Sequence, residues 1–278
     1  MIHKILIPTD GNGLEDHVIR YVARAFPSAE FYVVSVINTR ERGVQLTTLL
    51  YKEMKSSAEK AIERAKNILT EERIEKVHHR ILEGLPSHII NTYARRRDID
   101  LIALRVYSRK FTVSAQRMGS TIRNVIKGST VPILIIAEEC EKIPVKKVLF
   151  PTDGTRKSER AKNFAILFAS SHNTEIEVLH VMGRDGHRHH VEEILTNTEW
   201  KASFLNVKVR KAIEEVDVVE HILKHASDND MVIMGVGRKF LRWYHIGHVT
   251  QTIITHSPVP VILVPCIKKR WEQRMLRR

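Results

Sequence analysis

Two aspartates occupy positions from which a carboxylate can bind a ligand. Asp10 and Asp153 each follow a short apolar run that contains proline, and each precedes a glycine that breaks the run. A carboxylate there can accept a hydrogen bond from an amino or hydroxyl group of a base or a sugar. The neighbours that complete the two candidate loops are Pro8, Thr9, Pro151 and Thr152.

A second feature of each half suits a phosphate group. Gly119 opens one helical pattern and Gly247 opens another, and the free amides at a helix N-terminus favour an anion. Phosphate binding is therefore predicted near these glycines. The other candidate binding residues are Ser120, Thr121, Arg105, Arg109, Gly235 and Gly237, with Val36 and Val181 near the ends of the second predicted strands.

An internal repeat explains why these features occur twice. Residues 3–11 reappear as 146–154 at an offset of 143, and the block that begins at Gly119 reappears at Gly247 at an offset of 128. The second copy is therefore 15 residues shorter between these landmarks. We predict two domains, residues 1–138 and 145–266, followed by a basic tail at 267–278.

Each copy alternates apolar runs with helical patterns, which predicts a parallel sheet covered on both faces. The strands of the first copy are predicted at 4–8, 31–37, 76–82, 100–105 and 131–137. Those of the second copy are predicted near 147–151, 175–181, 205–211, 230–234 and 259–264. A long amphipathic helix is expected over 47–70, a shorter equivalent within 191–203, and a helix over 87–96 capped by Ser87.

The fold class predicted is α/β, with two flavodoxin- or Rossmann-like doubly wound domains that each contain a five-stranded parallel sheet. Ligands of such sheets bind beyond the carboxyl ends of the strands, where the strand order reverses. For the flavodoxin order 2-1-3-4-5, this places a site beside the loop after strand 1. Asp10 and Asp153 lie in that loop.

The composition is that of an ordinary globular protein. The chain has 278 residues, 43% of them hydrophobic and 28% charged, which excludes a disordered chain or a coiled coil as the whole molecule. No run reaches 18 apolar residues, so no transmembrane helix is expected, and the first residues lack the features of a signal peptide. Two cysteines, Cys140 and Cys266, are too few for a disulfide framework and fit a cytoplasmic location.

The charge is strongly basic, with a formal net value of +13. Residues 1–138 contain 22 basic and 15 acidic residues, and the last eleven residues contain six basic and one acidic. Such a balance attracts polyanions without specifying which, so nucleic acid, an acidic membrane surface, nucleotide phosphates and an acidic protein partner all stay open. In the tail, Ile267, Trp271 and Met275 recur every four residues, as in a short basic amphipathic helix. Such a helix docks on an acidic protein partner, a membrane surface or nucleic acid, or it packs on its own domain; a frayed end is the other alternative.

Both halves resemble universal stress protein domains. The resemblance rests on the opening strand-Pro-x-Asp-Gly, on the turn at Glu83, Gly84 and Pro86, and on the closing block from Gly119-Ser120 to Val131–Leu134. It implies a doubly wound fold and pairing of the two domains along their last strands, with a homodimer as a further option. Some members of the family bind ATP through Gly-x2-Gly-x9-Gly-Ser/Thr after strand 4, with the strand-1 aspartate near the adenine, and others do not bind it.

Both halves depart from that motif. In the first, Arg105 or Val106, and Arg109, stand where glycines are expected, and the offset from Arg105 to Gly119 is 14 instead of 13. In the second, the three glycines are present, but Gly235 to Gly247 spans 12 and His248 replaces Ser or Thr. A side chain in such a loop obstructs the approach of phosphates to the backbone, so the two phosphate cradles are damaged differently. The basic residues of these loops either bind anions themselves or are ordinary solvated side chains; they include Arg109, Lys110, Arg117, Arg238, Lys239 and Arg242.

Other clusters point to chemistry less specifically. The run from Asp185 to His190 matches no specific metal site, and no metal is predicted. His221 and His225 share a helix face and are expected to be an ordinary surface pair. The aromatic run from Trp243 to His245 either stacks on a base or covers a domain interface.

No enzyme motif accompanies these features: the chain has no Walker A sequence and no Gly-x-Ser-x-Gly. The main hypothesis is a non-enzymatic, stress-related nucleotide-binding or regulatory module whose ligand is ATP or another adenine nucleotide. The first alternative is a tandem that binds no ATP and acts through protein contacts. The second alternative is a weak nucleotide hydrolase.

Overall fold

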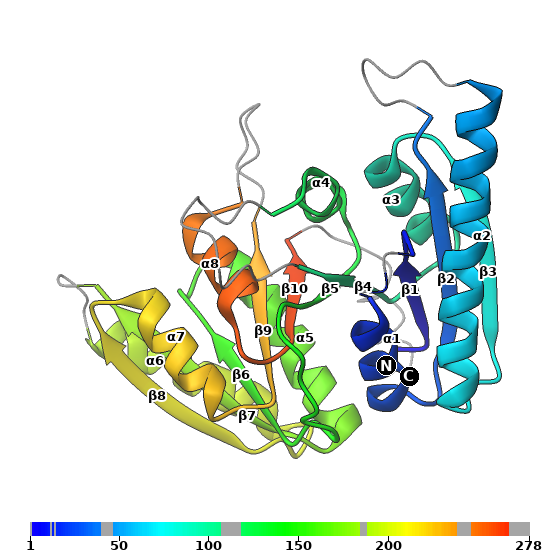
Figure 1. Ribbon diagram of the computed structural model, residues 1–278. Helices are drawn as coiled ribbons and strands as arrows, with labels where there is room; N and C mark the ends of the chain where they lie inside the picture. The colour runs from blue at the N-terminus through cyan, green and yellow to red at the C-terminus, as the bar shows by residue number, and fades with distance from the viewer. Residues whose placement is uncertain are drawn as a thin grey trace. The chain divides into compact units, whose positions relative to one another are not determined.

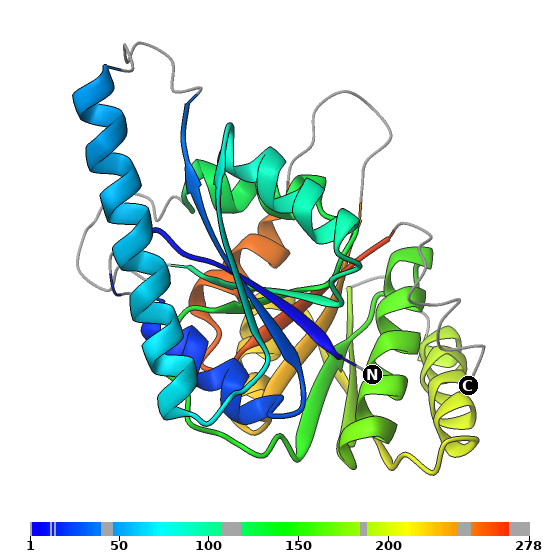
Figure 2. The same cartoon turned by 90° about the vertical axis from the view of Figure 1, so that its right-hand side faces the viewer.

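The structure is a computed structural model, and it describes residues 2–11, 13, 15–39, 47–106, 118–183, 188–237 and 246–266. The chain divides into two compact units, the first of which contains residues 2–105 and 118–134. The units correspond closely to the two halves of the sequence, and each half is described by itself (Figures 1 and 2).

The sheet of the first half has the strand order β3-β2-β1-β4-β5. β1 pairs in parallel with β2 and with β4, and β2 pairs in parallel with β3. The middle of β1 is buried on both faces, which requires helices on both sides of the sheet. The strands are β1 (Lys4–Pro8), β2 (Glu30–Ile37), β3 (Val77–Glu83), β4 (Leu101–Arg105) and β5 (Ile133–Ile136).

Two helix pairs cover this sheet, α1 with α2 on one face and α3 with α4 on the other (Figure 1). They are α1 (Asp16–Ala25), α2 (Thr48–Glu71), α3 (Pro86–Arg96) and α4 (Ser120–Gly128). The buried side of α2 includes the small residues Ala58, Ala61 and Ala65, which let this helix approach its neighbours closely.

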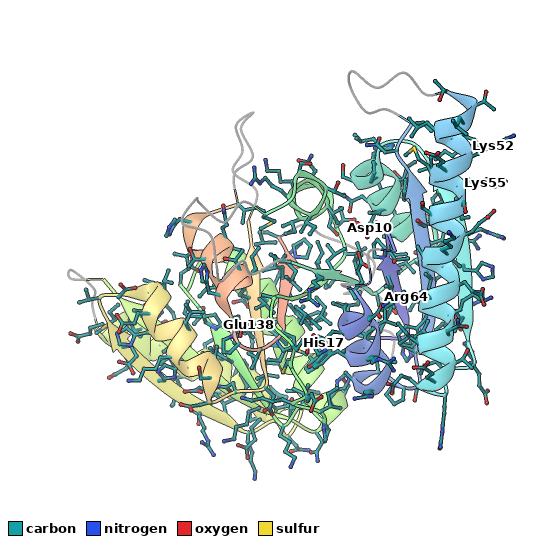
Figure 3. All side chains as sticks on the ribbon, in the orientation of Figure 1. Asp10, His17, Lys52, Lys55, Arg64 and Glu138 are labelled. Atoms are coloured by element: carbon teal, nitrogen blue, oxygen red, sulfur yellow. The ribbon has the colours of Figure 1, made fainter. Side chains whose placement is uncertain are left out.

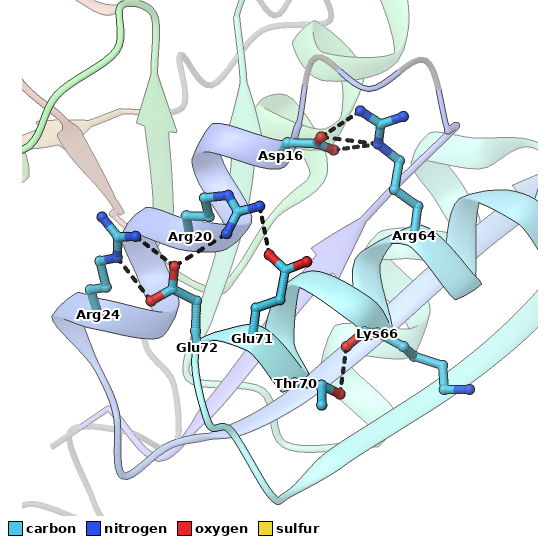
Figure 4. A network of polar contacts seen from close by, with 8 residues as sticks. All are labelled: Asp16, Arg20, Arg24, Arg64, Lys66, Thr70, Glu71 and Glu72. Atoms are coloured by element: carbon cyan, nitrogen blue, oxygen red, sulfur yellow. Dashed lines mark hydrogen bonds and ion pairs between the residues drawn. The ribbon is translucent and has the colours of Figure 1, made fainter.

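Ion pairs also join α2 to α1 (Figure 4). Arg64 of α2 binds the carboxylate of Asp16 at 2.6 Å. At the other end, Glu72, the residue that follows α2, accepts two hydrogen bonds from Arg24, at 2.7 and 2.8 Å, and one from Arg20 at 3.4 Å. The two helices are therefore tied at both ends of their contact.

The second half repeats the same arrangement, with the strand order β8-β7-β6-β9-β10. The strands are β6 (Lys147–Pro151), β7 (Glu175–Met182), β8 (Val209–Glu215), β9 (Met231–Val236) and β10 (Val261–Pro265). The helices are α5 (Arg156–His172), α6 (Arg188–Ser203), α7 (Val218–Ser227) and α8 (His248–His256). α5 packs with α6 and α7 packs with α8, so this sheet also has a helix pair on each face.

The predicted α/β fold class and the five strands of each half are confirmed, but three details were wrong. The order is 3-2-1-4-5, not 2-1-3-4-5, so the strand order reverses between strands 1 and 4 of each half. β8 begins at Val209 instead of residue 205, because a turn with Asn206 at φ +55° separates it from α6. Ser87 does not cap α3: Pro86 starts the helix, a position that its fixed φ and missing N–H suit.

None of the helices in the described ranges is long and apolar enough to cross a membrane.

Candidate functional site

A sharp turn at the end of β6 presents the second-half aspartate. The Thr152 amide donates to the carbonyl of Leu179 on β7, which continues the sheet one residue past β6. The Thr152 hydroxyl oxygen accepts from the Gly154 amide at 3.2 Å. Gly154 has φ +70°, a conformation that favours glycine, and a Cβ there would displace the end of the Ile194 side chain.

Asp153 is held as an ionised hydrogen-bond acceptor. One of its carboxylate oxygens accepts from the Thr155 amide at 3.0 Å and from the Thr155 hydroxyl at 2.6 Å. Burial alone would raise the pKa of Asp153, but the hydrogen bonds from Thr155 and Ser158 outweigh it and hold the pKa below its ordinary value. The carboxylate is therefore charged at neutral pH and can accept from a ligand.

A cavity of about 430 Å³ lies beside this turn, at the carboxyl edge of the sheet. It is bordered by the ends of β6, β7 and β9 and by the first turns of α7 and α8. Its size is that of a small-molecule binding site. All seven binding residues predicted for the second half line it: Pro151, Thr152, Asp153, Val181, Gly235, Gly237 and Gly247.

The start of α8 closes one side of the cavity. Gly247 is the N-cap residue, and no side chain caps the helix. No atom of the described residues lies within 4 Å of the position that a Gly247 Cβ would occupy. Anion binding by the amides of that turn stays a prediction, and exposed His248 stands where the family motif has Ser or Thr.

The first half repeats the turn and the helix start. The Thr9 amide donates to the Val34 carbonyl, and the Thr9 hydroxyl oxygen accepts from the Gly11 amide at 3.2 Å. Asp10 therefore follows β1 as Asp153 follows β6 (Figure 3). Gly119 is the N-cap residue of α4, again with no side-chain cap, and within the described ranges no atom lies within 4 Å of the place of a Cβ there. The predicted residues Pro8, Thr9, Asp10, Gly119, Ser120 and Thr121 thus lie at the ends of the two elements that position them.

Two substitutions make the first half chemically different. The offset of 143 aligns Glu15 with Ser158, and the strand registers align Arg105 with Gly235. Burial, the charge of Asp10 and a hydrogen bond to Asp10 raise the pKa of Glu15 to about 7. The second half thus offers one carboxylate and an open glycine, whereas the first offers a carboxyl pair and an arginine.

Sequence reasoning found part of this site and missed the rest. Val36 lies half-buried on β2, at the position that Val181 occupies on β7. Arg109 and the tail at 267–278 lie outside the described residues, and so do Lys110, Arg117, Arg238, Lys239 and Arg242. The side chains of the run from Asp185 to His190 are not described either. A residue-by-residue alignment of the two halves would have drawn attention to Ser158. The lining residues that were missed are Ser158, Leu179, His180, Val218, Ile222, Met234, Val236, Val249 and Thr250.

The prediction of an ordinary surface histidine pair was wrong. His225 is mostly buried, and its two ring nitrogens contact Glu177 at 2.7 Å and Glu214 at 3.1 Å. His221 lies 3.4 Å from the same Glu214 carboxylate. These groups tie α7 to β7 and β8. The described side chains contain no group of three or more His, Cys, Asp or Glu residues arranged to hold a metal ion.

Comparison with known proteins decides the family. The model described as "Universal stress protein family" matches residues 1–137 and, a second time, residues 144–265. The chain belongs to the universal stress protein family. The predicted tandem of two such domains is confirmed by the double match, because each match covers one copy of the internal repeat.

Relatives of this universal stress protein agree with that assignment. A universal stress protein of Methanocaldococcus jannaschii is 29% identical over 143 residues, which cover 48% of this chain and 81% of the relative. The structure of a universal stress protein from Archaeoglobus fulgidus matches with a TM-score of 0.80 at 20% identity, over 95% of this chain and 98% of the other. A protein of unknown function from Pseudomonas aeruginosa matches with a TM-score of 0.61 at 12% identity, over 95% and 92%. At these identities the two structures establish the tandem fold.

Proposed function

We propose that this universal stress protein binds one adenine nucleotide per chain, in the cavity of its second half. The observation that carries the proposal is the convergence of Asp153, Val181, Gly235, Gly237 and Gly247 on one cavity of about 430 Å³. These residues come from three strand ends and a helix start, and they combine an acceptor, an apolar wall and exposed backbone.

Each part of the cavity suits one part of the ligand. The apolar side chains of Val181, Ile222 and Met234 offer a surface for a base. Asp153, ionised and already oriented by Thr155, accepts from a ribose hydroxyl or from an exocyclic amino group. The glycines beside α8 let phosphate oxygens approach backbone amides.

The departures from the family motif fall on the phosphate side. The spacing between Gly235 and Gly247 is one residue short, and His248 replaces a hydroxyl residue, while the Asp153 side is intact. We therefore assign most of the affinity to the adenosine part of the ligand. The role that follows is binding and signalling, in preference to hydrolysis.

The first half is proposed not to bind the nucleotide. Its carboxyl pair of Asp10 and Glu15 replaces the single acceptor beside Ser158, and Arg105 replaces the open glycine. A second carboxyl group changes both the charge and the number of acceptors that face a ligand, so the two halves are not equivalent.

Calorimetric titration of the full chain with ATP and magnesium tests the proposal. We expect saturable binding near one nucleotide per chain. Asp153→Asn should weaken binding about tenfold or more, since a hydrogen bond to a charged group contributes roughly 1.5–3 kcal/mol. The matched variant Asp10→Asn should bind like the parent.

Loss of binding in Asp10→Asn with retention in Asp153→Asn would overturn the proposal, as would no binding by the folded parent. Release of inorganic phosphate well beyond one per chain would favour the alternative that the protein is a weak nucleotide hydrolase.

A further inference from the structure

A second cleft lies in the first half, at the end of the sheet that is opposite to Asp10. It has a volume of about 290 Å³, and the residues that matter for its chemistry are Tyr32, His78, Arg80, Tyr93 and Arg97. They come from the beginning of β2, from β3 and from the end of α3. Because the strands are parallel, this cleft lies at their amino ends, whereas Asp10 lies at their carboxyl ends.

The cleft is built on a fixed aromatic cluster. Tyr32 is buried, its ring stacks on that of His78 with 4.6 Å between centroids, and Tyr93 meets it edge-on at 6.4 Å. The Tyr32 hydroxyl donates to Glu30 at 3.1 Å, and the same carboxylate oxygen lies 3.7 Å from His78. Tyr32 is therefore held in place, while the His78 side chain is 54% exposed and Tyr93 is partly exposed.

Positive charge lies beside these rings. The Arg97 guanidinium lies 5.8 Å from the centre of the Tyr93 ring. Arg80 is two residues after His78 on β3, so the two side chains leave the strand on the same face. Among the described residues, no carboxylate forms an ion pair with Arg80 or Arg97, in contrast to Arg20, Arg24 and Arg64 (Figure 4). Both guanidinium groups are thus free to pair with an anion from outside.

The second half has other residue types at the equivalent positions, so the fold itself does not require this cluster of aromatic and basic side chains. The strand registers align Tyr32 with Glu177 and His78 with Arg210, and the helices align Tyr93 with His225. There Glu177 accepts from His225 at 2.7 Å and from Asn229 at 2.6 Å, so this carboxylate is occupied by neighbouring side chains. Arg210 in turn lies 3.5 Å from the Glu175 carboxylate. The same place in the first half carries exposed rings, and its arginines form no ion pair with a described carboxylate.

We propose that this cleft of the first half binds single-stranded nucleic acid. A base stacks on the exposed rings of His78 and Tyr93, and the flanking phosphates pair with Arg80 and Arg97. Aromatic rings among unpaired arginines favour nucleic acid over an acidic peptide, because a peptide carboxylate would use the arginines and leave the rings without a partner. The first half has an excess of positive charge, with 22 basic and 15 acidic residues in 1–138, and this excess also favours binding of a polyanion such as nucleic acid.

Fluorescence anisotropy of the full chain with a labelled twelve-nucleotide oligouridine, at several salt concentrations, tests the proposal. Tyr93→Leu should weaken binding about fivefold or more, whereas Tyr93→Phe, which keeps the ring, should bind like the parent. Arg80→Gln with Arg97→Gln should lower the slope of log K against log salt by about 1.4, the value for two phosphate contacts on a single strand. The matched control, Lys52→Gln with Lys55→Gln, removes two exposed charges from α2 (Figure 3) and should change the slope less.

Three results would overturn the proposal. One is no binding of the oligonucleotide at low salt. Another is unchanged binding in both the tyrosine and the arginine variants. The third is equal competition by polyglutamate or inorganic polyphosphate together with unchanged binding in Tyr93→Leu, which would show attraction of polyanions without base stacking. Thermal melts of each variant, followed by circular dichroism, separate these results from loss of the fold.

Discussion

Replacing Glu15 with glutamine should stabilise the protein at alkaline pH. Burial and the neighbouring Asp10 raise the pKa of Glu15 from 4.5 to about 7, so the folded chain keeps a proton that the unfolded chain has lost. Stability should therefore fall as the pH rises from about 4.5 to about 7, and stay low above that. Glutamine keeps a hydrogen-bond donor toward Asp10 and cannot ionise, so the penalty should disappear.

The expected gain in stability follows from the difference between the pKa of Glu15 in the folded and in the unfolded chain. A difference of about 2.5 pKa units corresponds to at most about 3.4 kcal/mol. Because Glu15 is only partly buried, solvent screening reduces this, and we expect Glu15→Gln to gain about 1–2 kcal/mol at pH 8 and little at pH 4.5.

Urea unfolding at pH 4.5, 6 and 8 measures this effect, with circular dichroism and tryptophan fluorescence recorded together. All three tryptophans, Trp200, Trp243 and Trp271, lie in the second half, so fluorescence follows that half while circular dichroism follows both. The pH-dependent gain should appear in circular dichroism. Equal stabilities of the parent and Glu15→Gln at pH 8 would refute the account of the carboxyl pair.

Three further predictions follow from the same contacts. Gly235→Arg, which copies Arg105 into the second half, should abolish nucleotide binding in calorimetry without lowering the melting temperature; normal binding would show that an open glycine is unnecessary there. Burial lowers the pKa of His225, but its hydrogen bonds with Glu214 and Glu177 raise it overall, so His225→Ala should cost more stability at pH 6 than at pH 9, measured by urea unfolding. The hydrogen bonds from Arg24 are the largest influence on the pKa of Glu72 and hold it below its ordinary value, so Glu72→Ala should cost about 1 kcal/mol at pH 7 and less in 1 M salt, where screening weakens the pairs in the parent.

Most of the fold could be predicted from sequence because buried parallel strands have a local signature. The run Lys4–Pro8 is β1 residue for residue, and the repeat at residue 146 shows that the fold occurs twice. Strand order depends on contacts far apart in sequence, so the predicted 2-1-3-4-5 was wrong. β8 was misplaced because apolar Leu205 and Val207 lie between α6 and the strand, while the strand itself is largely polar.

The candidate site was predictable only in part, for a related reason. The glycines and aspartates stand out because few residues suit a sharp turn or a close approach of backbone to ligand. Ser158 and Glu15 lie in ordinary helical sequence, and their importance comes from the aspartate that the preceding turn places beside them. That relation belongs to the folded chain, so no motif marks it.

The number of nucleotides bound per chain tests the central claim most directly. Equilibrium dialysis of the full chain against radiolabelled ATP with magnesium gives this number without an assumption about heat. The asymmetry between Ser158 and Glu15 predicts a stoichiometry of one for the parent and for Asp10→Asn, and a large loss of affinity for Asp153→Asn. A stoichiometry of two, or none at millimolar ATP, would contradict it.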